Sequence, residues 1–152
     1  MKPGEEEEAS KLILDCFTEF VGHEYSQEGI GEFQRYVRPD ALRQRSKVDH
    51  FTLVATVKDE MAGVIEIRRT AHISLLFVDQ QFHRRGIAKG LLHRALLMSG
   101  TENPGFERVT VNSLRYAVRV YEKLGFQRAG GEQTVKDIIF VPMMLDLDQR
   151  DR

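Results

Sequence analysis

The segment from Ile73 to Ser99 limits the folds open to this chain more than any other part of the sequence. It begins with an apolar, β-favouring run that ends at Val78, and it continues through a short basic loop that contains Gly86. From Ile87 onward, apolar residues recur at the spacing of one helical face. This order predicts a buried strand that leads through a glycine-containing loop into a helix.

The loop between this strand and this helix has the properties of an anion site. The first amides of a helix have no intrahelical partner, and the helix dipole favours negative charge there. Gly86 leaves the main chain open, and Arg84, Arg85 and Lys89 add positive charge. We therefore predict a phosphate-binding loop, and the alternative is a capped helix that carries three cations by chance.

Two short motifs in this half of the chain resemble the signature sequences of a known superfamily. The first is His83-Arg-Arg-Gly-Ile-Ala88, and the second is Val118-Arg-Val-Tyr-Glu-Lys-Leu-Gly-Phe126. They resemble the Q/R-x-x-G-x-G/A signature and the FYEKLGF element of the GCN5-related N-acetyltransferases (GNAT superfamily), with His83 in place of the usual Gln or Arg. The resemblance covers roughly Phe51 to Leu147. It implies an α/β (α+β) fold with a mixed, mostly antiparallel central sheet flanked by helices.

The resemblance also implies how acetyl-coenzyme A would bind. The loop would hold the pyrophosphate, and main-chain groups at the end of the strand would hydrogen-bond the pantetheine arm. The expected cofactor-binding residues are Leu76, Phe77, Val78, His83, Arg84, Arg85, Gly86, Ile87, Ala88 and Lys89. Many members add an Asn seven residues before the family's Tyr. Leu114 stands at that position here, so the nearby Asn112 is the remaining candidate.

One catalytic group is implied by the second motif. Tyr121 matches the family's Tyr. A phenol, with a reference pKa near ~10, can give a proton to the departing thiolate of coenzyme A. The alternative is an aromatic side chain that only packs.

The general base is less well defined by the sequence. His72 stands eleven residues before His83, where histone-acetylating members carry a Glu, and its imidazole can accept a proton at neutral pH. Strand alternation places His72 on one face with Ser74, Leu76 and Val78. Glu66 on the preceding strand is the rival candidate, and many members use water alone as the relay. A polar residue at the end of a strand without a catalytic role is the alternative for both.

The hydrophobic periodicity predicts the remaining elements. Two helices and a further turn are expected within residues 5–47, and no strand is found before the first helix, which departs from the family. The later elements are strands at 51–57, 61–68 and 72–78, a helix at 87–99, a strand at 107–111, a helix at 115–124, and strands at 126–129 and 138–145.

We expect one domain over residues 1–152, with acceptor-side helices at about 5–47 and an acetyl-coenzyme A-binding core at about 51–147. In the family, the first region folds over the acceptor. Tyr25, Phe33 and Tyr36 are therefore candidates for the acceptor pocket, and core packing is the alternative reading of these aromatics.

The composition narrows the function classes. The net charge of -1 gives no global field for nucleic acid, and no apolar run approaches the ~20 residues that would span a membrane. Without a signal-peptide core, a cytoplasmic location is expected. Cys16 reads as apolar filler, and the histidines lack metal-ligand spacing, so we expect no metal.

The function implied by these features is N-acetylation of a primary amine, on a small molecule or a peptide, by direct attack on acetyl-coenzyme A in a ternary complex. A non-catalytic acetyl-coenzyme A sensor is the alternative. A nucleotide-phosphate binder of another class is disfavoured because the longer P-loop and GxGxxG patterns are missing. A homodimer through the terminal strands is a further expectation.

Overall fold

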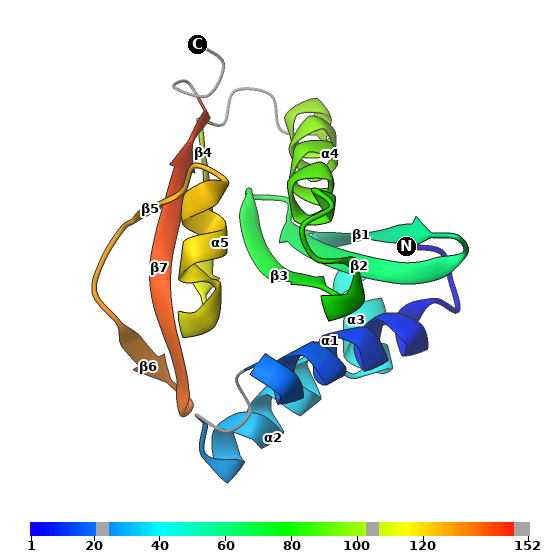
Figure 1. Cartoon of the computed structure of the whole chain (residues 1–152), viewed down its shortest axis with the longest axis horizontal. Coiled ribbons are helices and arrows are strands. Elements are labelled where there is room, and N and C mark those ends of the chain that lie inside the picture. The colour runs from blue at the N-terminus through cyan, green and yellow to red at the C-terminus, as the bar shows by residue number, and fades with distance from the viewer. Residues whose placement is uncertain (21–24, 103–106, 148–152) are drawn as a thin grey trace.

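The computed structural model describes residues 1–20, 25–102 and 107–147 (Figure 1). Three helices come first: α1 (Glu6–Phe20), α2 (Gln27–Tyr36) and α3 (Pro39–Ser46). The other elements are β1 (His50–Val57), β2 (Glu60–Arg68), β3 (His72–Val78), α4 (Ile87–Glu102), β4 (Arg108–Ser113), α5 (Val118–Lys123), β5 (Gln127–Arg128), β6 (Gln133–Val135) and β7 (Ile138–Asp146). Short 3-10 turns, Gln80–Phe82 and Arg115–Ala117, precede α4 and α5.

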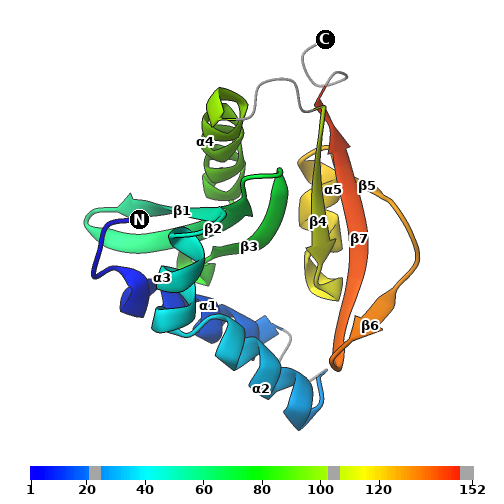
Figure 2. The ribbon, with the colours of Figure 1, turned by 180° about the vertical axis from the view of Figure 1, so that it is seen from behind.

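The strands form one seven-stranded sheet in the order β1-β2-β3-β4-β7-β5, with β6 also paired to β7. Every paired neighbour is antiparallel except β3 and β4, which run parallel. That parallel pair is short, because only His72 with Thr110 and Ile73 with Val111 are in register. Beyond them the two strands diverge, and Figures 1 and 2 show β3 curving away from β4.

Helices cover both faces of the sheet and give it two cores. On one face, Leu91 and Leu92 of α4 pack with Ile65 and Ile67 of β2, and α5 joins the same core through Tyr121. On the other face, α1, α2 and α3 pack against β2 and β3. The second core includes Ile13, Phe17, Phe33, Leu42, Val64, Leu75 and Phe77. The apolar spacing of each helix therefore matches the face that it buries.

A β-bulge in β3 changes which residues face which core. Ile67 of β2 pairs with Ile73, but the next residue back, Glu66, pairs with Leu75, so Ser74 is an extra residue in β3. Ile73 accordingly lies in the α4-side core, whereas Leu75 lies in the core under α1–α3. The prediction from simple alternation, that His72 shares a face with Leu76 and Val78, is therefore wrong.

Other differences from the sequence-based elements are local. The strand expected at 126–129 is only Gln127–Arg128, and the helix expected at 115–124 begins as a 3-10 turn. Strand β6 was not predicted. It forms because Lys136 and Asp137 both take positive φ, +51° and +62°, as a two-residue hairpin turn requires. Residues 1–20 contain no strand before α1.

Candidate active site

The first of two adjoining cavities has a volume of about 360 Å³ and lies among the end of β3, the loop after it, the start of α4, and α5. Eight residues that the sequence assigned to the cofactor line it: Leu76, Val78, His83, Arg84, Gly86, Ile87, Ala88 and Lys89. A basic loop and an apolar wall therefore meet in one cavity, as a molecule with a diphosphate and a pantetheine arm requires.

The loop presents main-chain donors to this cavity. Arg84 and Gly86 take left-handed φ values of +66° and +76°, and such alternation turns successive amides toward one side. The first α4 bond runs from the Gly90 amide to the Gly86 carbonyl, at 2.9 Å. The amides of residues 87–89 thus have no intrahelical acceptor, and they lie at the positive end of the helix dipole.

Gly63 of β2 fixes the position of this helix start. A Cβ added there would lie 3.1 Å from both Ile87 Cγ2 and Leu91 Cδ1. The first turns of α4 therefore approach the sheet more closely than any larger residue at position 63 would allow.

Four of the cofactor candidates lie differently from expectation, although one of them, His83, still lines the first cavity. The ring of His83 turns back, with Nε2 2.8 Å from the Val78 carbonyl oxygen, so this side chain braces the loop on β3. The guanidinium of Arg85 lies 5.5 Å from the Phe82 ring centre and does not line the cavity. The Phe77 side chain and Asn112 line the second cavity instead of the first.

This geometry predicts that Arg84 and Arg85 contribute differently to the binding of acetyl-coenzyme A. Arg84→Gln is expected to raise the Kd of acetyl-coenzyme A about tenfold, because a hydrogen bond to a charged group contributes about 1.5 kcal/mol. Arg85→Gln removes the same charge outside the cavity and should raise the Kd much less. Calorimetric titration of both variants at low and high salt measures this difference. Equal losses in the two variants would mean that only the net charge of the loop matters.

The second cavity has a volume of about 380 Å³ and lies on the other side of the gap between β3 and β4. Phe33, Tyr36 and His72 line it, as the sequence suggested for an acceptor pocket and its base. Tyr25 does not line either cavity. It is buried, stacks on Phe17 and donates its hydroxyl to the Ile139 carbonyl at 2.8 Å, so it joins the N-terminal helices to β7.

Four residues line both cavities: Leu76, Tyr116, Ala117 and Tyr121. Tyr121 is only 5% exposed, and burial raises the pKa of its phenol well above the usual value. Its carbonyl accepts bonds from the amides of Leu124 (3.0 Å) and Phe126 (2.9 Å), so the turn that ends α5 fixes its position. Tyr121 therefore keeps its proton at neutral pH and stands where the two cavities meet.

Tyr116 was missed by the sequence reasoning because it lies outside both motifs. It is half-buried in the 3-10 turn before α5, and burial raises the pKa of its phenol too. Its ring stacks on Phe20 at 5.3 Å, and Phe20 stacks in turn on His83 at 5.8 Å. The end of α1 thus connects the loop of the first cavity with the wall shared by both.

His72 lies at the narrow end of the second cavity, where β3 and β4 still pair. It is half-buried, and its Nδ1 lies 2.8 Å from Thr110 Oγ1. Burial lowers the pKa of the imidazole, and the nearby charge of Arg68 lowers it further. His72 is therefore neutral at pH 7 and able to accept a proton.

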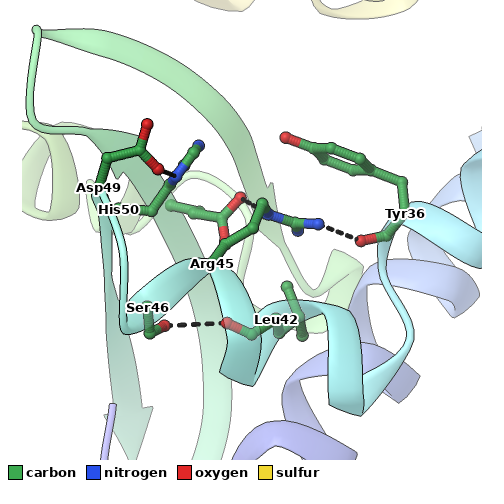
Figure 3. Close-up of polar contacts among 7 residues, drawn as sticks. Tyr36, Leu42, Arg45, Ser46, Asp49 and His50 are labelled. Atoms are coloured by element: carbon green, nitrogen blue, oxygen red, sulfur yellow. Dashed lines mark hydrogen bonds and ion pairs between the residues drawn. The ribbon is translucent and has the colours of Figure 1, made fainter.

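Glu66, the rival base, belongs to a buried ion pair and lines neither of the two cavities. Figure 3 shows its partner, Arg45, beside Tyr36. The Glu66 carboxylate is 0% exposed and lies 3.1 and 3.2 Å from Nε of Arg45. Arg45 also donates from Nη1 to the Tyr36 carbonyl at 2.7 Å and covers the Tyr36 ring at 3.8 Å. Burial raises the pKa of the Glu66 carboxyl, against the effect of Arg45. The pair thus holds α3 to β2 and supports the Tyr36 wall of the second cavity.

The structure also bears on the thiol of Cys16, on metal binding and on membrane crossing. Cys16 is buried, its thiol donates to the Val78 carbonyl at 3.5 Å, and burial raises its pKa to about 12, which suits a packed thiol and not a nucleophile. Among the described residues, no cluster of His, Cys, Asp or Glu is arranged to hold a metal ion. No helix in the described ranges is long and apolar enough to cross a bilayer.

Residues 21–147 match the family model of the acetyltransferase (GNAT) domain. The chain belongs to the GNAT family. It is 28% identical over 127 residues to the uncharacterized N-acetyltransferase YafP of Escherichia coli K12, covering 83% of this chain and 77% of that protein. This membership confirms the resemblance seen in the two motifs and makes the chain an acetyl-coenzyme A-dependent N-acetyltransferase.

Solved structures show the same fold at low sequence identity. A GCN5-related N-acetyltransferase from Rhodopseudomonas palustris superposes with a TM-score of 0.79 at 18% identity, over 97% of this chain and 92% of that one. The PaiA N-acetyltransferase of Thermoplasma acidophilum, solved with coenzyme A, gives 0.77 at 20% identity, over 96% and 95% of the two chains. The predicted mixed sheet flanked by helices is therefore confirmed.

Proposed function

We propose that this GNAT protein binds acetyl-coenzyme A in the cavity of the basic loop and a primary amine in the cavity across β3. The observation that carries the proposal is the wall common to both cavities, which includes Leu76 and Tyr121. Two reactants that enter from opposite sides of the diverging strands would meet at this wall. Such an arrangement suits direct attack in a ternary complex and needs no acyl-enzyme.

Each step of the transfer has a candidate group. The amine nitrogen attacks the thioester carbon, and main-chain donors of residues 76–78 stabilise the developing oxyanion. The carbon–sulfur bond then breaks, and the Tyr121 phenol protonates the departing thiolate. The proton lost by the amine passes to His72 or to water, and exchange with solvent restores both groups.

The role of His72 has a pH signature. Because its pKa is lowered from 6.5, the imidazole stays unprotonated below the usual range, so the acid limb of kcat/KM should fall at a pH below about 6.5. His72→Gln should abolish this limb and lower kcat/KM at neutral pH. A pH profile of the variant that matches the wild type would assign the proton to water instead.

One assay tests turnover through the two cavities directly. Protein with acetyl-coenzyme A is mixed with a panel of primary amines, and free thiol is followed. The proposal predicts amine-dependent thiol release. A protein that is thermally stabilised by acetyl-coenzyme A, yet releases no thiol with any amine, would be a sensor. The cytoplasmic location and the homodimer stay predictions from sequence.

A further inference from the structure

The second cavity has an unusual charge balance for a site that takes amines. Three charged side chains line it besides the neutral His72: Arg68, Lys136 and Glu32. Glu32 accepts an ion-pair contact from Arg35 at 2.7 Å, and both Arg35 and Lys136 lower the pKa of its carboxyl. The one carboxylate of the lining is thus outweighed by its neighbouring cations.

The charges around this cavity are of both signs. Behind the Tyr36 wall, Arg45 is paired with Glu66. At the other end, Lys136 also lines a neighbouring hollow with Glu28, Glu32 and Asp137. Arg68 lies beside His72 at the narrow end of the cavity, and the salt bridges of the described ranges include none to Arg68 or to Lys136. The side chains that line the cavity itself therefore include two cations and one carboxylate, with one cation at the narrow end and one at the β6–β7 turn.

The rest of the lining is mainly apolar and rich in aromatic side chains, with Ser74 and Asn112 as polar members. Phe33 and Tyr36 come from α2, Leu75 and Phe77 from β3, and Ile138 and Phe140 from β7. Such walls suit an aromatic or branched apolar body, which rings of this kind can stack against. They offer few acceptors for a substrate with many ammonium or hydroxyl groups.

From this balance we infer that the acceptor is a monoamine that carries a carboxylate on an aromatic or branched apolar body. This inference rests on the proposed function, because it takes the second cavity as the acceptor site. Arg68 or Lys136 pairs with the carboxylate. A polycationic amine, which has no carboxylate to pair with these cations, is repelled by them.

The test compares two benzylamines that differ by one charge, 4-(aminomethyl)benzoate and 4-(aminomethyl)benzamide, with spermidine as the polycation. The thiol-release assay should give a kcat/KM for the benzoate about tenfold above that for the benzamide, equivalent to about 1.4 kcal/mol. Spermidine should be the poorest of the three.

Matched variants locate the carboxylate. Arg68→Gln or Lys136→Gln should reduce the benzoate-to-benzamide ratio severalfold. The ratio is the readout because any change that Arg68→Gln causes in the His72 base affects both substrates alike. Lys11→Gln, which removes an exposed cation on α1, should leave the ratio as it is. A ratio near one in the wild type, a preference for spermidine, or a ratio unaffected in both cavity variants would overturn the inference.

The outcomes also distinguish failure of this inference from failure of the proposed N-acetyltransferase function on which it rests. Turnover of spermidine or the benzamide without the benzoate would overturn the anionic acceptor and keep the N-acetyltransferase. No thiol release with any of the three amines, nor with any amine of the wider panel, would overturn both.

Discussion

Replacing Tyr121 with phenylalanine is expected to lower kcat by roughly 10²- to 10⁴-fold, the usual range for the loss of a general acid. The phenol is buried, its pKa is raised, and it lines both cavities, so it is protonated when the thiolate leaves. The ring itself packs edge-to-face on Phe126 at 5.3 Å, and phenylalanine keeps that contact. The Kd of acetyl-coenzyme A should therefore change little, and single-turnover kinetics with a binding titration measures the two effects separately.

Tyr116→Phe provides the matched comparison, because Tyr116 also lines both cavities and also has a raised pKa. If Tyr121 is the acid, the Tyr116 variant should retain far more activity than the Tyr121 variant. The reverse order would transfer the role to Tyr116. A loss shared equally by both would indicate that the packing of the common wall, and not one proton, controls the rate.

Arg45→Ala is expected to reduce the free energy of unfolding by about 3–5 kcal/mol, since it leaves the buried Glu66 carboxylate without its partner. The same change removes the contact of Arg45 with the Tyr36 carbonyl and ring. Urea denaturation at pH 7 measures the loss. A decrease below about 1 kcal/mol would mean that water reaches Glu66 or that it is already protonated.

Two further variants separate the charge from the packing. The double variant Arg45→Met with Glu66→Leu removes both charges at similar volume and should recover most of the lost stability.

Burial raises the folded-state pKa of Glu66, so the folded protein holds the carboxyl proton of Glu66 more tightly than the unfolded chain does. The stability that the folded protein gains from this raised pKa of Glu66 is therefore fully present below the ordinary pKa of 4.5. This stability is lost as pH rises through the folded-state pKa. Glu66→Gln should remove this pH dependence.

The sequence predicted the parts of the site that depend on local chemistry. The loop from His83 to Lys89 and the position of Tyr121 follow from short motifs whose backbone roles are local, and all of these residues except Arg85 line one cavity or both. The apolar period likewise located the strands and helices that frame them.

The parts that could not be predicted depend on contacts between distant segments. The bulge at Ser74 is set by pairing with β2, and it moved His72 away from the face given by alternation. Glu66 meets Arg45 across 21 positions of the chain, which no spacing rule detects. The β6–β7 turn consists of Lys136 and Asp137, whereas Asn-Gly is the usual signal of such a turn. The sequence therefore did not predict it.

We propose that the amides at the start of α4 hold the diphosphate of coenzyme A while its pantetheine arm follows β3 toward Tyr121. A crystal structure of the protein with coenzyme A tests this most directly. We expect phosphate oxygens within hydrogen-bond distance of the amides of residues 86–89, and the sulfur at the wall between the two cavities. Coenzyme A bound elsewhere, with the loop after β3 making no contact to phosphate, would contradict this binding mode.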